Sequence, residues 1–172
     1  KLIETDPTCA KAYHGRGLAH AARRNYDAAI RDFSESIRRS PRAGALYSRG
    51  MAYAVTENSE LALNDLDEAI RLAPDWAEAY YARGVVCERL GQYQAAAQDL
   101  EQATSLRPDF ALAHLARGIV RTATKDYSWA LRDLNTALSL DPGQLLRYVK
   151  AAVGGQAALD GLREGHLNGC MS

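Results

Sequence analysis

The prolines of this chain recur at an almost constant interval, and no other feature constrains the fold as strongly. Successive prolines are separated by 34, 33, 34 and 34 residues. They are Pro7, Pro41, Pro74, Pro108 and Pro142. Small residues recur in the same register, at Gly17, Gly50, Gly84 and Gly118, at Ala29, Ala62, Ala96 and Ala130, and at Ser36, Ala69, Ala103 and Ala137. This interval predicts copies of one structural unit, and the small residues indicate places where two helix backbones approach closely.

Within each unit the spacing of the large and small residues predicts two helices. The third unit shows i, i+4, i+7 spacing twice, at Tyr80, Gly84 and Cys87 and then at Ala96, Leu100 and Ala103. Gly91 and Gln92 lie between these helices and predict a turn, and Pro108 ends the second helix because proline cannot continue it. The other units carry Tyr13, Gly17, His20 with Ala29, Phe33, Ser36; Leu46, Gly50, Tyr53 with Ala62, Leu66, Ala69; and His114, Gly118, Arg121 with Ala130, Leu134, Ala137.

This order of an aromatic residue, Gly, Tyr, Ala, Phe and Pro over 34 residues resembles the tetratricopeptide repeat family. The resemblance covers residues 10 to 142 and departs from the pattern in the last unit, where His114 and Arg121 replace aromatic residues. It implies an all-α fold, an α-solenoid of stacked helix-turn-helix repeats that forms a right-handed superhelix. The first helix of each unit would line a concave inner surface. One hairpin cannot bury its apolar stripe alone, so stacking is expected on physical grounds too.

The resemblance divides the chain into segments. They are the tail of a preceding repeat (1–9), four repeats (10–42, 43–76, 77–110 and 111–144), two capping helices (145–164) and a frayed tail (165–172). Because the chain starts within a repeat, we expect it to be a piece of a longer protein. The predicted cap carries Leu145, Leu146 and Val149, which makes it more apolar than a cap facing water.

The balance of charge argues against nucleic acid as a partner. Lys and Arg together number 21, as do Asp and Glu, so the formal net charge is zero. A nucleic-acid-binding protein needs a basic excess to neutralise phosphates. Arginines do gather near the N-terminus, at Arg23, Arg24, Arg38, Arg39 and Arg42. We interpret this group as a solvated helix face because carboxylates lie nearby in the sequence.

Metal, cofactor, membrane and catalytic signatures are also missing from the sequence. The three cysteines are odd in number and far apart, and no two histidines show H-x-x-x-H spacing. No apolar run approaches the roughly 20 residues that cross a bilayer. The sequence contains no phosphate-binding loop and no Gly-x-Ser-x-Gly elbow. We therefore expect no cofactor, no metal, no membrane insertion and no enzymatic activity. No signal-peptide pattern is visible either, but a chain that starts within a repeat makes this absence uninformative. We leave the compartment open and favour a cytoplasmic location.

Two charged positions recur in all four units, sixteen residues apart. The arginines are Arg16, Arg49, Arg83 and Arg117, and the aspartates are Asp32, Asp65, Asp99 and Asp133. The turn lies midway between them, so an antiparallel hairpin brings them to the same height. A row of guanidinium groups that binds a ligand is one interpretation. We favour a structural ion-pair ladder, because each charge comes with its opposite.

A second apolar stripe runs along the predicted first helices, beside the one that the hairpin core uses. Its members are His14, Leu18, Tyr47, Met51, Tyr81, Val85, Leu115 and Ile119. In the family this stripe faces the concave groove, so the resemblance implies a partner-binding surface. The alternative is that individual members pack against the adjacent unit.

The residues along the groove narrow the class of partner. Family members that bind the acidic C-termini of chaperones use a clamp of Lys, Asn and Arg, but the matching positions here hold His14, Leu18, Ser48, Glu78 and Ala82. We therefore predict a protein or peptide partner with an apolar or amphipathic segment. Tyr47, Met51 and Tyr81 would anchor it, and Lys11, Glu78, Glu88 and Arg89 would form the rim. Two other hypotheses remain: self-association through the ends of the array, as a structural protein, and service as the interaction arm of a larger enzyme.

Overall fold

The computed structural model of the chain describes residues 9–143 and residue 146. The predicted capping helices (145–164), apart from Leu146, lie outside the described residues. The same holds for the frayed tail (165–172) and for residues 1–8 of the predicted tail of a preceding repeat.

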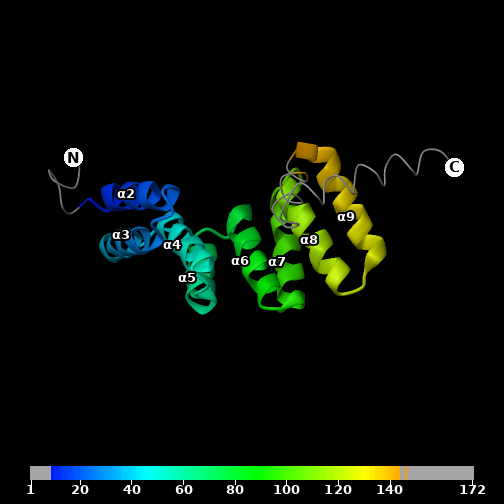
Figure 1. The fold of residues 1–172 in the computed structure, drawn as a ribbon, viewed down its shortest axis with the longest axis horizontal. Helices are drawn as coiled ribbons and strands as arrows, with labels where there is room; N and C mark the ends of the chain where they lie inside the picture. Colours follow the sequence, from blue (N-terminus) through cyan, green and yellow to red (C-terminus); the bar gives the residue numbers. More distant parts are fainter. Residues whose placement is uncertain (1–8, 144–145, 147–172) are drawn as a thin grey trace. The chain divides into compact units, whose positions relative to one another are not determined.

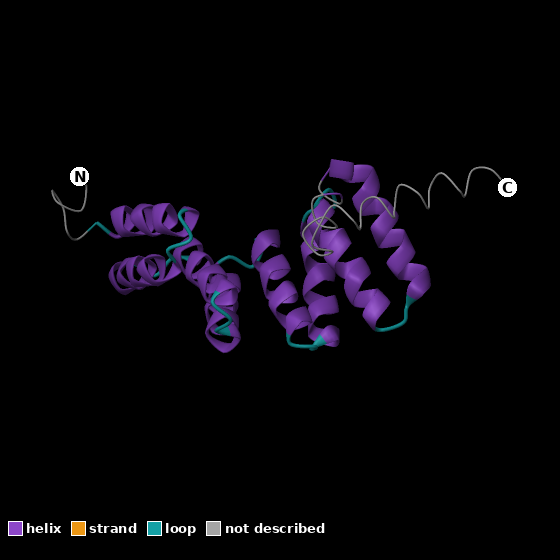
Figure 2. Ribbon diagram, viewed as in Figure 1, coloured by secondary structure: helices purple, strands orange, loops and turns teal. Residues whose placement is uncertain are grey.

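The described residues form an all-α array of helical hairpins, with no strand among them (Figures 1 and 2). The helices are α2 (Ala10–Ala22), α3 (Tyr26–Arg39), α4 (Ala43–Val55), α5 (Ser59–Leu72), α6 (Ala77–Arg89), α7 (Tyr93–Leu106), α8 (Ala111–Ala123) and α9 (Tyr127–Leu140). Consecutive helices pack in pairs: α2 with α3, α4 with α5, α6 with α7, and α8 with α9. This confirms the predicted solenoid of helix-turn-helix repeats.

The recurring prolines determine where each second helix ends. Helices α3, α5, α7 and α9 each stop two residues before a proline, because the residue preceding proline is disfavoured in the α region. The tight turn within each hairpin contains one residue in the left-handed region. It is Gly91 in the third hairpin (φ 72°), whereas Arg24, Glu57 and Lys125 take this conformation in the others (φ 59°, 63° and 65°). Only the third turn therefore uses the residue that favours this backbone.

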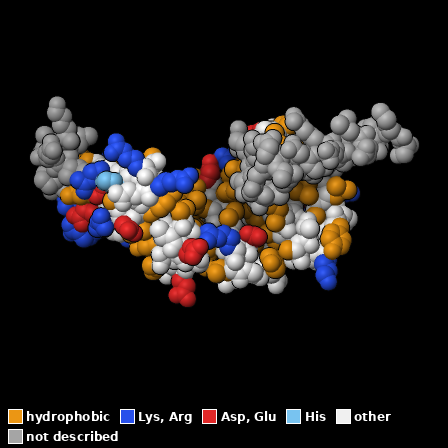
Figure 3. All heavy atoms as spheres, in the orientation of Figure 1, with side chains coloured by type: hydrophobic (Ala, Val, Ile, Leu, Met, Phe, Trp, Pro, Cys, Tyr) orange, Lys and Arg blue, Asp and Glu red, His pale blue; other side chains and the backbone are white. Residues whose placement is uncertain are grey.

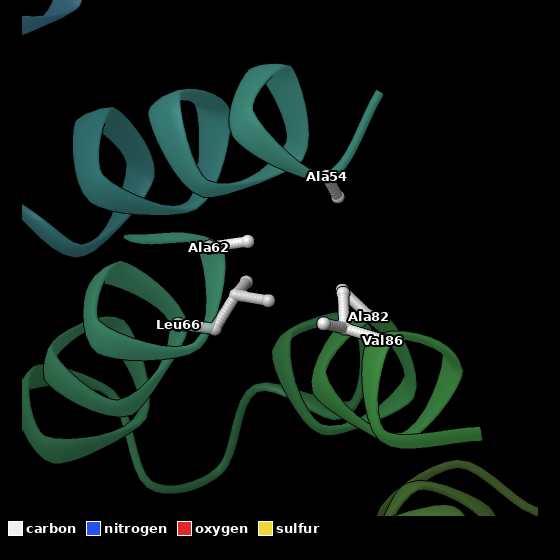
Figure 4. Packing of buried hydrophobic residues seen from close by; sticks show 5 residues of the cluster. All are labelled: Ala54, Ala62, Leu66, Ala82 and Val86. Atoms are coloured by element: carbon white, nitrogen blue, oxygen red, sulfur yellow. The ribbon is translucent and has the colours of Figure 1, made fainter. Parts of the chain in front are cut away.

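The chain divides into two compact units, Lys1–Pro108 and Asp109–Ser172. In the first, α3 packs on α4 and α5 packs on α6, while the first helices α2, α4 and α6 contact one another in succession. Figure 4 shows the apolar contact between the second and third hairpins, formed by Ala54, Ala62, Leu66, Ala82 and Val86. Leu66 has no exposed surface. Each hairpin of this unit thus buries its apolar stripe against its neighbour.

The described part of the second unit is the single hairpin of α8 and α9. Ala130 and Ala137 of α9 are buried against α8, but Leu131 and Leu138 of the same helix are exposed. Their equivalents in α5, Leu63 and Ile70, are partly buried and buried. The face of α9 that a following helix would cover is therefore open in the described part of the chain.

Candidate partner-binding groove

Each first helix packs against the second helix of its own hairpin at a glycine position. This contact determines which way the side chains next to the glycine point. A Cβ atom at Gly17 would lie 2.6 Å from Cε1 of Phe33, and one at Gly84 would lie 2.9 Å from Cγ of Leu100. These positions point into the hairpin and have no room for a side chain. Because an α-helix turns about 100° per residue, the residue after each glycine points away from this contact.

The residues that follow these glycines form an apolar row on the surface of the first unit. Leu18 of α2 is 48% exposed, Met51 of α4 is 36% exposed, and Val85 of α6 is partly buried. Since α2, α4 and α6 contact one another in succession, the three side chains lie at equivalent places on neighbouring helices. We call Leu18, Met51 and Val85 the groove row.

Two of the three predicted groove residues one turn before this row, His14 and Tyr47, take part in packing between hairpins. The ring of Tyr47 lies 4.6 Å from that of Trp76, measured between centroids. Burial raises the pKa of the Tyr47 hydroxyl. The ring of His14 lies 5.6 Å from that of Phe33, and its Nε2 is 3.0 Å from Oγ of Ser48 in the next hairpin. Tyr81 is partly buried.

In the second unit the two predicted groove residues differ in exposure. Leu115 is only 4% exposed, and Ile119 is partly buried. Packing within the described part of the structure thus takes up most of the Leu115 surface. Among the eight predicted residues, the accessible apolar surface is concentrated at Leu18 and Met51.

Two of the four predicted rim residues make polar contacts within the first unit. Arg107 donates to Oε1 of Glu78 (2.6 Å), and Nη1 of Arg89 donates to the backbone carbonyl of Ala54 (2.8 Å). The carbonyl of Ala54 lies in the last turn of α4, where carbonyl groups have no amide partner in their own helix. The hydrogen bond from Arg89 supplies the missing donor. Lys11 is exposed, and Glu88 is partly buried. The repeat pattern contained no signal for either contact.

The four Arg–Asp positions are joined within their hairpins by paired hydrogen bonds. In the third hairpin, Nε and Nη2 of Arg83 donate to Oδ2 and Oδ1 of Asp99 at 2.8 and 2.6 Å. Hydrogen bonding to Asp99 raises the pKa of Arg83. The pairs Arg16–Asp32, Arg49–Asp65 and Arg117–Asp133 have the same two-bond geometry. Such bidentate pairs fix orientation as well as adding energy, and all four aspartates are buried.

Two of these arginines also reach the preceding hairpin, which the sequence analysis missed. Nη1 of Arg83 donates to Oδ1 of Asp67 at 2.7 Å, and Nη1 of Arg49 donates to Oγ of Ser34 at 2.9 Å. Ser34 and Asp67 occupy the same place in α3 and α5, two residues after the ladder aspartate. A polar residue at that spacing was therefore an available signal. Arg49 and Arg83 therefore each connect the two helices of their own hairpin and also bind the preceding hairpin.

In the last hairpin, the two residues that depart from the repeat pattern, His114 and Arg121, both lie close to Asp133. Nη1 of Arg121 donates to Oδ2 of Asp133 at 2.6 Å, and Nδ1 of His114 lies 3.6 Å from Oδ1 of Asp133. Asp133 therefore has cationic or polar neighbours on α8 in addition to Arg117. His114 is buried in this arrangement.

Within residues 9–143, His, Cys, Asp and Glu side chains form no group that could hold a metal ion. Over the same part of the chain, every helix is too short or too polar to cross a membrane.

Comparison with known families identifies the class of protein. Two family models, each described as "Tetratricopeptide repeat", match this chain, one over residues 50–121 and the other over residues 2–44 and 14–75. Together they extend from residue 2 to residue 121. The chain belongs to the tetratricopeptide repeat family, whose members serve in protein–protein interaction. No curated protein matches it.

Several solved structures share this fold. MamA from Desulfovibrio magneticus RS-1 is 22% identical, with a TM-score of 0.75 over 83% of this chain and 81% of that one. YrrB, described as a TPR protein with an unusual peptide-binding site, is 25% identical, with a TM-score of 0.72 over 84% and 75%. The first TPR of Spaghetti (RPAP3), bound to the HSP90 peptide SRMEEVD, is 22% identical, with a TM-score of 0.66 over 67% and 93%.

Proposed function

We propose that this protein binds an apolar or amphipathic segment of another protein along its first helices. The observation that carries the proposal is the groove row, in which Leu18 and Met51 are exposed at equivalent places on neighbouring helices of one unit. Burying a Leu or Met side chain fully contributes about 1.5–3 kcal/mol. Because Leu18 is 48% and Met51 36% exposed, a segment that covers both gains only part of this free energy, and its other contacts supply the rest.

Peptide binding by relatives supports a peptide ligand. YrrB is described as having a peptide-binding site, and the Spaghetti domain was solved with an HSP90 peptide. That peptide, SRMEEVD, ends in acidic residues. Here Leu18 stands exposed in one of the positions that family members use for a polar clamp, and Ala82, in another, is buried between hairpins. An apolar anchor on the ligand therefore suits this surface better.

Selection of peptides against the full chain tests this function. A library of random 12-residue peptides displayed on phage supplies candidate ligands, and calorimetry gives their affinities. We expect the selected peptides to share apolar residues at helical or alternate spacing. The double substitution Leu18→Glu with Met51→Glu should weaken their binding at least about tenfold, because burying two charges opposes the apolar contact.

Leu61 of α5 provides a matched control. Its side chain is 47% exposed, close to the 48% of Leu18, but it lies on a second helix outside the groove row. Leu61→Glu should leave peptide affinity within about twofold of the parent protein. Equal losses from the Leu61 variant and the groove-row variant would refute the proposed site.

A further inference from the structure

A cavity of about 230 Å³ lies within the first unit, where the starts of α2 and α4 meet the end of α3. Its lining residues are Ala10, Lys11, His14, Ser36, Arg42, Gly44 and Ala45. Neither helix carries an acidic residue in its first turn, and neither has a side-chain hydrogen bond at its N-cap. Among the described residues, the cavity thus lies beside two helix starts that lack a side-chain hydrogen bond from the N-cap residue.

The charged side chains that line this cavity are both cationic. Lys11 comes from α2 and Arg42 from the loop between α3 and α4, and the part of the lining that residues 9–143 supply contains no carboxylate. Neither cation forms an ion pair within the described part of the chain, although Nε of Arg42 donates to Oγ of Ser40 at 3.3 Å. The neighbouring Arg38 and Arg39 differ, because both are paired with Glu35. Figure 3 shows Lys and Arg side chains gathered around this first hairpin.

His14 completes the lining and reports on its electrostatics. The hydroxyl of Ser48 donates to the carbonyl of Gly44 at 2.8 Å, so Oγ of Ser48 accepts from Nε2 of His14. Burial lowers the pKa of His14 below its usual value of 6.5. A hydrogen bond to the backbone of Gly44 acts in the opposite direction and is the smaller of the two effects on this pKa.

We propose that this cavity binds a single anionic group, a carboxylate or a phosphate, between Lys11 and Arg42. Each cation would contribute a charge-assisted contact, and the amides at the start of α4 favour a negative charge in the same place. The volume of 230 Å³ exceeds that of one such group, so the group could be carried by a larger molecule. The site shares His14 and Lys11 with the predicted groove and its rim, but it does not depend on the proposed function.

Titration of the full chain with free ions tests this site directly. Inorganic phosphate and acetate are added separately at constant ionic strength, with chloride as the reference salt. The imidazole signals of the four histidines are followed by NMR across pH. We expect a saturable rise in the pKa of His14, because a bound anion favours its protonated form, with no such rise at His20. A response to phosphate, to acetate or to both supports the site and identifies which source of negative charge it accepts.

Two sets of variants distinguish anion binding in this cavity from a general effect of the protein's net charge on anion affinity. Lys11→Ala and Arg42→Ala should each weaken anion binding about fivefold, the effect of removing one unit charge roughly 4 Å away in water. The single variants Arg31→Ala and Lys125→Ala each remove the same unit of charge from exposed positions outside the cavity, and we expect both to bind as the parent does. No saturable change at His14 with either ion, or equal losses in both sets of variants, would overturn the proposal.

Discussion

Two neighbouring positions on the first helices of this protein serve opposite purposes. Gly17 and Gly50 face the second helix of their own hairpin, whereas Leu18 and Met51, the next residues in the chain, lie at the surface. A Cβ atom would lie 2.6 Å from the Phe33 ring at Gly17 and 3.1 Å from Cγ of Leu66 at Gly50, whereas the positions that follow hold large apolar side chains that the described residues leave partly exposed. A step of one residue, about 100° around the helix, thus separates the glycine that packs within the hairpin from the apolar side chain that is available to a partner.

Each side of this comparison makes a distinct prediction. Substitutions at the glycine positions should change the free energy of unfolding, and substitutions in the groove row should change binding alone. Stability effects are therefore expected at the glycines, at the ladder and at Tyr47, which packs against Trp76.

The largest effect on stability is expected for Gly17→Ala. Its Cβ would lie 2.6 Å from Cε1 of Phe33, a rigid ring with no exposed surface, so the hairpin must open. We expect a loss of about 3 kcal/mol in the free energy of unfolding, measured in urea. Gly15→Ala on the same helix is the control. Nothing lies within 4 Å of its Cβ, so it should stabilise the protein by about 0.5–1 kcal/mol. Equal effects of the two substitutions would remove the distinction between the faces.

A smaller loss is expected when one member of an Arg–Asp pair is removed. Asp99→Asn should lower the free energy of unfolding by about 2 kcal/mol, because the neutral amide accepts only one of the two hydrogen bonds from Arg83 and turns its NH2 group toward the other guanidinium nitrogen. Replacing Arg83 by Met as well should be less harmful than the sum of the two single changes. A double-mutant cycle measured by urea unfolding checks this. Strict additivity would mean that the pair contributes nothing as a pair.

The smallest effect concerns Tyr47 and Trp76, whose rings are 4.6 Å apart. A double-mutant cycle with Tyr47→Ala and Trp76→Ala should give a coupling free energy of about 1 kcal/mol, typical of an aromatic pair. Its presence would mean that Tyr47→Ala affects folding as well as any binding. A coupling free energy near zero would mean that Tyr47 does not stabilise the contact between the hairpins. Tyr47 would then be counted with the groove row as a residue available to a partner.

The sequence was sufficient to predict the hairpins and the pairing of charges within them. Proline spacing predicted where α3, α5, α7 and α9 end, because the restriction that proline places on its neighbour is local. The interval of sixteen residues between Arg83 and Asp99 was informative for a similar reason. An antiparallel hairpin with a short turn leaves little freedom in which residues lie opposite each other.

Contacts between hairpins could not be predicted in the same way. Whether Tyr47 lies on Trp76 or in solvent depends on side-chain rotamers and on the packing angle between neighbouring hairpins. The repeat interval determines neither of these. The same applies to Arg89, whose long side chain reaches the carbonyl of Ala54 in the preceding hairpin. The stripe predicted from the sequence therefore contains side chains that pack, such as Leu115, beside side chains that are open, such as Leu18.

Site-specific photo-cross-linking tests the division between the two faces most directly. A photoreactive amino acid replaces Met51 in one protein and Leu61 in another, and each is irradiated with a peptide selected against the parent chain. Both positions carry exposed apolar side chains, but only Met51 belongs to the groove row. We expect cross-linking of the peptide at position 51 and little at position 61. Cross-linking at position 61 with none at position 51 would contradict it.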